Sequence, residues 1–132
     1  MIKSGIFHPQ LSRVLAELRH MDTLVIGDAG LPIPKGVERV DLGWRAGSPK
    51  YLEVLDEVLK AIVVEKALFA DEALQVSPDF HKQALGLLPK NLPVEYVSHH
   101  ELKQKSAEAK AIVLTGEFTP YTNVILVCGC AY

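Results

Sequence analysis

Residues 23–34, T-L-V-I-G-D-A-G-L-P-I-P, carry the pattern that decides the fold class. Thr23–Gly27 is short, apolar and rich in β-branched side chains, which is typical of a buried strand. The stretch from Asp28 to Pro34 contains Gly30 and two prolines, and these residues interrupt both helical and strand periodicity. We therefore expect a buried strand that ends at an aspartate in a loop.

Helices and strands alternate on both sides of this stretch. The apolar residues before it have helical spacing and predict a helix that ends near Arg19 and His20: Leu11, Val14, Leu15 and Leu18. Pro9 suits the first turn of that helix. Further strands are expected at residues 37–42, 67–70, 94–97, 111–114 and 124–127. Further helices are expected from about 49 to 62, from 78 to 87 behind an N-cap at Ser77, and from 99 behind a capping box that begins at Ser98.

This alternation predicts an α/β fold: a single three-layer domain over residues 1–132, with a largely parallel sheet of about six strands and helices on both faces. Ligands of such sheets bind beyond the carboxyl ends of the strands. The residues that follow the predicted strands are therefore candidates for a binding site: Asp28, Ser98, His99 and residues 115–117.

Composition narrows the classes of function. The chain has 132 residues and a formal net charge of -2, which disfavours nucleic acid as a partner. It contains no apolar run of roughly 18 residues and no leader pattern at its start, so we expect a cytoplasmic protein. Cys128 and Cys130 lack the spacing of a zinc or redox motif and are expected to be buried free thiols.

Two residues near the first strand are candidates for acid–base chemistry. His20 lies at the predicted end of a helix, where the partial negative charge favours an imidazolium, and a histidine can both donate and accept a proton near neutral pH. The alternative is a histidine that only caps the helix. Asp28 is placed to orient a histidine or to bind a sugar hydroxyl, and its alternative is a turn closed by its own backbone.

Two later segments are candidates for ligand binding. His99 and His100 open a helix near the same edge, either as a ligand contact or as a solvated pair; a metal site built from His20, Asp28 and His99 has no supporting spacing motif. Tyr121 and Asn123 would face the same side of an extended segment, where a ring and an amide suit a sugar. Gly116 and Pro120 make a turn the alternative for this segment.

Together these blocks resemble the D-ribose pyranase and L-fucose mutarotase family over essentially the whole chain. The resemblance is carried by L-R-H at 18–20, I-G-D-A-G-L-P-I-P at 26–34, Ser98-His99, and G-E-F-T-P-Y-T-N at 116–123. The two longer blocks are specific in combination. The length and the G-E-F-T-P-Y block are more similar to the ribose branch than to the fucose branch.

The resemblance implies an isomerase that interconverts the pyranose and furanose forms of D-ribose by acid–base ring opening and closing, in support of ribose uptake and utilisation. It implies that His20 is the catalytic residue, and it implies these substrate-binding residues: Asp28, His99, Tyr121, Thr122 and Asn123. It implies no metal and no organic cofactor. It also implies a ring-like homo-oligomer, expected to be a decamer, with sites near subunit contacts.

Three alternatives remain open from the sequence. The same residues would serve a non-catalytic sugar-binding or regulatory module. They would also serve a mutarotase for L-fucose, because selectivity among hydroxyl patterns depends on the detailed shape of the pocket. A structural subunit of a larger assembly would use these polar residues for contacts and would bind no sugar.

Overall fold

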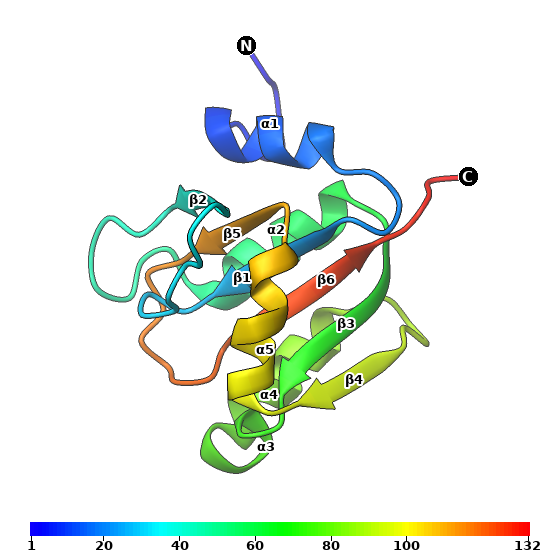
Figure 1. The fold of residues 1–132 in the computed structure, drawn as a ribbon. Helices are drawn as coiled ribbons and strands as arrows, with labels where there is room; N and C mark the ends of the chain where they lie inside the picture. The colour runs from blue at the N-terminus through cyan, green and yellow to red at the C-terminus, as the bar shows by residue number, and fades with distance from the viewer.

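A six-stranded sheet with the strand order β2-β5-β1-β6-β3-β4 forms the centre of the molecule, whose computed structural model describes residues 1–132 (Figure 1). The strands are β1 (Thr23–Gly27), β2 (Glu38–Asp41), β3 (Val64–Ala70), β4 (Val94–Val97), β5 (Ala111–Leu114) and β6 (Val124–Cys128). The helices are α1 (Pro9–Glu17), α2 (Tyr51–Ala61), α3 (Ala73–Val76), α4 (Pro78–Leu87), α5 (His99–Lys105) and the 3-10 turn η1 (Ser106–Glu108).

The sheet is mixed, with one strand opposed to the other five. β1 is parallel to β5, β5 is parallel to β2, and β3 is parallel to β4. β6 lies between β1 and β3 and is antiparallel to both. The prediction of a largely parallel sheet of about six strands is confirmed, and the reversed β6 is an addition to it. Its reversal brings residue 123 to the edge where β1 and β5 end.

Helices cover both faces of the sheet, so the four inner strands, β5, β1, β6 and β3, are largely buried and their side chains alternate between two cores. In β1, Leu24 and Ile26 join the core beneath α1, α2 and α4, whereas Val25 joins the core beneath α5. Figure 1 shows α5 crossing one face while α2 and α4 lie on the other. This three-layer arrangement confirms the predicted α/β class.

Four local expectations have mixed outcomes: those for Ser77 and Cys130 need correction, and those for Ser98 and Cys128 are confirmed. Ser77 does not cap α4 through its side chain; its hydroxyl donates instead to the carbonyl oxygen of Pro120 at 3.3 Å. Ser98 does cap α5, because its Oγ accepts from the backbone N–H of Glu101 at 3.1 Å. Cys128 is buried as expected, but Cys130 is exposed because it follows the end of β6.

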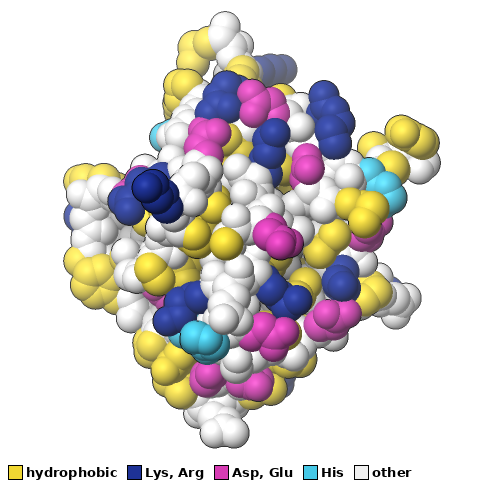
Figure 2. Space-filling view, in the orientation of Figure 1, with side chains coloured by type: hydrophobic (Ala, Val, Ile, Leu, Met, Phe, Trp, Pro, Cys, Tyr) yellow, Lys and Arg dark blue, Asp and Glu magenta, His cyan; other side chains and the backbone are white.

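The visible surface carries charges of both signs. Figure 2 shows Lys and Arg side chains interspersed with Asp and Glu across the face that α5 covers, with no extended region of one sign. No helix has both the length and the apolar character that crossing a bilayer requires.

Candidate functional site

Asp28 follows β1 directly and lies half-buried at the carboxyl edge of the sheet. Its Oδ1 accepts from the backbone N–H of Gly30 at 3.0 Å, so the turn considered as the alternative role is present. Burial raises the pKa of Asp28, and the hydrogen bond from the backbone N–H of Gly30 partly opposes the rise. A carboxylate with one oxygen engaged in a turn is rigid and can still present its other oxygen to a hydroxyl group.

Asn123 fixes the position of Asp28 from the start of β6. The backbone N–H of Asp28 donates to Asn123 Oδ1 at 2.9 Å, and the amide nitrogen Nδ2 is buried without a hydrogen-bond partner. Gly27 makes this approach possible, because a Cβ there would lie 2.7 Å from Asn123 Oδ1 and 2.6 Å from Leu31 Cδ2. The amide therefore joins the end of β1 to the start of β6.

His99 begins α5 beside the same edge. Its backbone N–H donates to both carboxylate oxygens of Glu72, at 2.8 and 3.1 Å, while its ring meets Tyr121 edge to face with centroids 5.0 Å apart. The ring atom Nδ1 is buried without a partner. Burial, and then Lys103, lowers the pKa of His99, so a neutral imidazole is favoured at pH 7.

The segment around Tyr121 is a turn and not an extended strand. Tyr121 has a φ of 61°, and the hydroxyl of Thr122 donates to the carbonyl oxygen of Thr119 at 2.9 Å. The prediction that Tyr121 and Asn123 face one side of an extended segment is therefore wrong about the backbone. Both side chains nevertheless lie beside Asp28 or His99, because the turn presents the ring outward and the amide inward.

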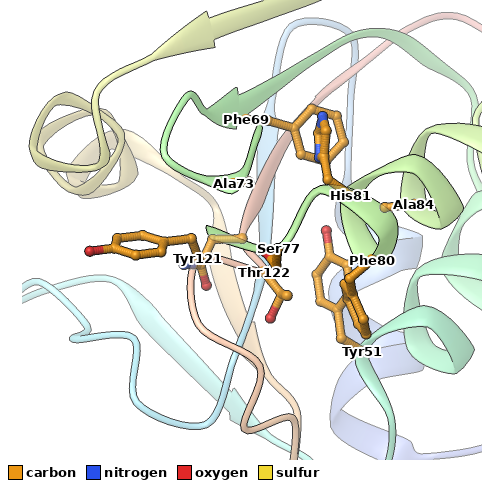
Figure 3. Close-up of a pocket in the computed structure, with 10 residues that line it drawn as sticks. Tyr51, Phe69, Ala73, Ser77, Phe80, His81, Ala84, Tyr121 and Thr122 are labelled. Atoms are coloured by element: carbon orange, nitrogen blue, oxygen red, sulfur yellow. The ribbon is translucent and has the colours of Figure 1, made fainter. Parts of the chain in front are cut away.

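An open hollow of about 500 Å³ lies over this edge, within the usual size of small-molecule sites. We call it the rim hollow, and these residues line it: Asp28, Ala29, Gly30, His99, Glu117, Phe118, Thr119, Pro120 and Tyr121. Thr122 and Asn123 lie beneath it, where they line a cavity of about 10 Å³ together with Tyr51 and His81. In Figure 3 the ring of Tyr121 points away from the side chains of Tyr51, Phe80 and His81.

Glu117 belongs to residues 115–117, which were candidates for the binding site because they follow a predicted strand, although Glu117 was given no specific role. It is buried, its Oε1 accepts from the backbone N–H of Tyr51 at 3.3 Å, and its Oε2 accepts from the Thr119 hydroxyl at 3.0 Å. These bonds tie the loop that lines the rim hollow to the start of α2.

Glu72 was missed altogether. It precedes the four-residue helix α3, which the sequence did not predict, and it reaches His99 from a distant part of the chain.

His20 lies at the opposite edge of the sheet from the rim hollow. It precedes β1, its side chain is half-exposed, and its Nε2 is 3.1 Å from Glu65 Oε2. It lines a separate hollow of about 470 Å³, here called the distal hollow, with the end of α1 and residues 128–132. Within one chain, therefore, Asp28 and His99 come together and His20 does not join them. Because His20 lies at the opposite edge, His20, Asp28 and His99 of one chain cannot bind a common metal ion.

Comparison with known proteins identifies the relatives of this chain. The sequence matches the model of the RbsD / FucU transport protein family over residues 1–131. The chain belongs to the RbsD / FucU family. A D-ribose pyranase of Laribacter hongkongensis is 48% identical over 129 residues, which cover 98% of each chain.

Two solved structures extend the comparison within the RbsD / FucU family. The structure of Bacillus subtilis RbsD complexed with D-ribose superimposes with a TM-score of 0.95 at 39% identity, covering 100% of both chains. A fucose mutarotase of Streptococcus pneumoniae in complex with L-fucose has a TM-score of 0.80 at 22% identity and covers 99% of this chain and 100% of its own. The second likeness shows the shared fold alone.

Proposed function

We propose that this chain is a D-ribose pyranase, an isomerase that interconverts the pyranose and furanose forms of D-ribose by opening and closing the sugar ring. The observation that carries the proposal is the rim hollow, in which Asp28, His99 and Tyr121 converge. The match of this chain, at 39% identity, to a protein whose structure was solved with D-ribose supports ribose as the ligand. The reaction supports ribose uptake and utilisation, and we place it in the cytoplasm.

The residues of the rim hollow suit a polyhydroxylated ring. Asp28 accepts hydrogen bonds from hydroxyl groups, and the His99 ring, which lines the same hollow, forms a hydrogen bond with another hydroxyl. The Tyr121 ring packs against the C–H face of the sugar. The side chains of Thr122 and Asn123 hold this segment in place, because the Thr122 hydroxyl donates to the carbonyl oxygen of Thr119 and Asn123 Oδ1 accepts from the backbone N–H of Asp28.

Ring opening requires a proton to be delivered to the ring oxygen and another to be removed from the anomeric hydroxyl, and ring closure reverses both transfers. Such acid–base catalysis contributes on the order of 10²–10⁴ in rate. We propose that His20 donates this proton. The reaction so written uses neither a metal nor an organic cofactor.

The position of His20 requires that it act on a sugar bound by another copy of the chain. We propose a ring-like homo-oligomer, a decamer, in which the distal hollow of one copy faces the rim hollow of the next. The half-exposed side chain of His20 and the openness of the rim hollow support this arrangement, because both leave room for a neighbour. Each complete site would then combine residues of two copies.

Exchange NMR on equilibrated D-ribose tests the proposal. Protein should accelerate exchange between pyranose and furanose signals, and His20→Ala should lose most of that acceleration while it keeps the fold and the binding of ribose. Binding without acceleration by the unmodified protein would instead support a non-catalytic sugar-binding module. Acceleration with L-fucose and not with ribose would support the fucose branch, and full activity of His20→Ala would refute the role of His20.

A further inference from the structure

The turn that carries His20 is held in a demanding backbone conformation. Met21 has a φ of 72°, in the left-handed region that non-glycine residues seldom adopt. Its backbone N–H donates to the carbonyl oxygen of Cys128 at 2.9 Å, and Cys128 N–H donates back to Asp22 at 2.8 Å. The Asp22 carboxylate also accepts from Arg19 N–H at 2.7 Å. These bonds dock the turn against the end of β6 and fix the backbone from which the His20 ring projects.

Glu65 reaches His20 from an irregularity in β3. The pairing of β3 with β6 shifts between Val64, which lies opposite Cys128, and Lys66, which lies opposite Val127. Glu65 is therefore the extra residue of a bulge. Bulges redirect side chains and are common next to active sites. The redirected carboxylate places Oε2 3.1 Å from His20 Nε2.

Gly129 packs closely against the segment that carries Glu65. A Cβ at residue 129 would lie 3.2 Å from Val63 Cγ1, which is tighter than side chains normally pack, whereas its 3.4 Å distance to Glu65 Cβ would be an ordinary contact. Gly129 N–H also donates to the carbonyl oxygen of Val63 at 2.9 Å, so the close approach is maintained by the backbone. A bulge and a left-handed turn thus converge on the contact between His20 and Glu65.

Stability does not account for this convergence. The side chains of His20 and Glu65 are 51% and 45% exposed, and exposed ion pairs contribute only about 0–1 kcal/mol. Positioning a proton-transferring group is a role that does need fixed geometry, because small displacements of such groups reduce rates strongly.

We propose that Glu65 is a positioning residue that orients His20 for proton transfer. The inference rests on the proposed catalytic role of His20. The Glu65 carboxylate accepts a hydrogen bond from Nε2–H of His20 and directs Nδ1 away from the chain, toward the sugar held by a neighbouring copy. The proton is then carried on Nδ1. As the sugar ring opens, the imidazolium releases it to the ring oxygen and the resulting neutral imidazole takes the proton of the anomeric hydroxyl; ring closure reverses both transfers.

Other charged and titratable groups surround His20. Arg19 and Asp22 lie on the same turn, and Cys128, Cys130 and the C-terminal Tyr132 line the distal hollow or the end of β6. Burial, with Asp22 and Glu65 adding to it, raises the pKa of the Cys128 thiol to about 11, so it stays neutral at pH 7. Asp22 is already engaged by Arg19 N–H, which leaves Glu65 as the carboxylate bonded to the imidazole.

The variant Glu65→Gln tests the proposal in the assembled protein, with Glu95→Gln as the matched control. Glu95 is an exposed glutamate of the same sheet, paired with Lys66 at 3.2 Å and remote from His20. Glu65→Gln should lower kcat about 10-fold with little change in KM, since the sugar contacts stay intact. Glu95→Gln should change neither quantity.

A double variant separates this proposal from the proposed function. If Glu65 acts through His20, His20→Ala combined with Glu65→Gln should be no slower than His20→Ala alone. Nitrogen NMR of the His20 ring should also show that Glu65→Gln mixes two tautomers where the unmodified protein shows one. Full activity of His20→Ala would overturn the role of His20 and of Glu65 together. An inactive His20→Ala with a Glu65→Gln that matches Glu95→Gln would overturn the role of Glu65 alone.

Discussion

The opposite placement of His20 and Asp28 predicts that two inactive variants will restore activity when they share an oligomer. His20 precedes β1 and Asp28 follows it, and the five residues of the strand, at about 3.3 Å per residue, separate them by roughly 17 Å. A pentose is much shorter than this separation. A site that uses both residues must therefore take them from two copies.

The test combines two chains in one oligomer, one with His20→Ala and the other with Asp28→Ala. Each variant alone should lose on the order of 10²–10⁴ in rate, because one lacks the proton donor and the other lacks a sugar contact. When both chains are co-expressed in equal amounts, about a quarter of the sites should combine an intact His20 with an intact Asp28, since each site draws one residue from each neighbour. The mixed protein should therefore recover up to about a quarter of the unmodified activity.

The assay is exchange NMR on D-ribose with mixed oligomers purified through two different affinity tags, one on each chain. A chain that carries both substitutions, paired with either single variant, is the control and should recover nothing. Mixed oligomers that contain both chains and remain as inactive as the single variants would refute the reasoning, because they would show that His20 and Asp28 never contribute to a common site.

Three further predictions concern the rim hollow. Gly27→Ala should lower the free energy of unfolding by about 1–3 kcal/mol in urea titrations, because its Cβ would overlap Asn123 and Leu31, whereas Gly86→Ala, with nothing within 4 Å, should not destabilise α4. Asp28→Asn should abolish activity and stabilise the protein at pH 7, because burial raises the pKa of Asp28 and so penalises its carboxylate in the folded protein. In urea titrations, the difference in unfolding free energy between the variant and the unmodified protein should shrink at lower pH, as the carboxyl group of the unmodified protein becomes protonated. A difference that stays constant with pH would contradict this prediction. Because the pKa of His99 is lowered, KM for ribose should stay constant down to about pH 6.5 in initial-rate assays and rise only below it.

The sequence predicted most elements because their apolar patterns are local. Thr23–Gly27 and Pro78–Leu87 have the bounds that were expected from them. The direction of β6 was not predicted, since a strand buried on both faces has the same composition in either direction. A signal was present, however: residues 115–123 contain no helix, and a parallel return normally needs a crossover of a dozen or more residues.

Only part of the candidate site was predicted, because local patterns place residues along strands but do not show contacts between distant segments. Asp28 and His99 follow strands, and the rule that ligands bind at carboxyl ends brings them together correctly. The same rule places His20, which precedes β1, at the other edge. Its nearness to Asp28 along the chain suggested a shared site, but a strand of five residues separates the two in space. Glu72 could not be found from pattern, because its contact with His99 joins distant segments.

The reversed β6 connects the two edges that this division leaves apart. Its first neighbour, Asn123, holds the backbone of Asp28 at the rim hollow, and its last residue, Cys128, holds the turn that carries His20. A parallel strand in the same place would present its ends the other way round and could not bring the turn at residues 119–122 to Asp28. If each site combines the rim hollow of one copy with the distal hollow of the next, as proposed above, β6 is the rigid element that links two successive sites through one chain. In such an assembly, its central position between β1 and β3 would fix the spacing between those sites.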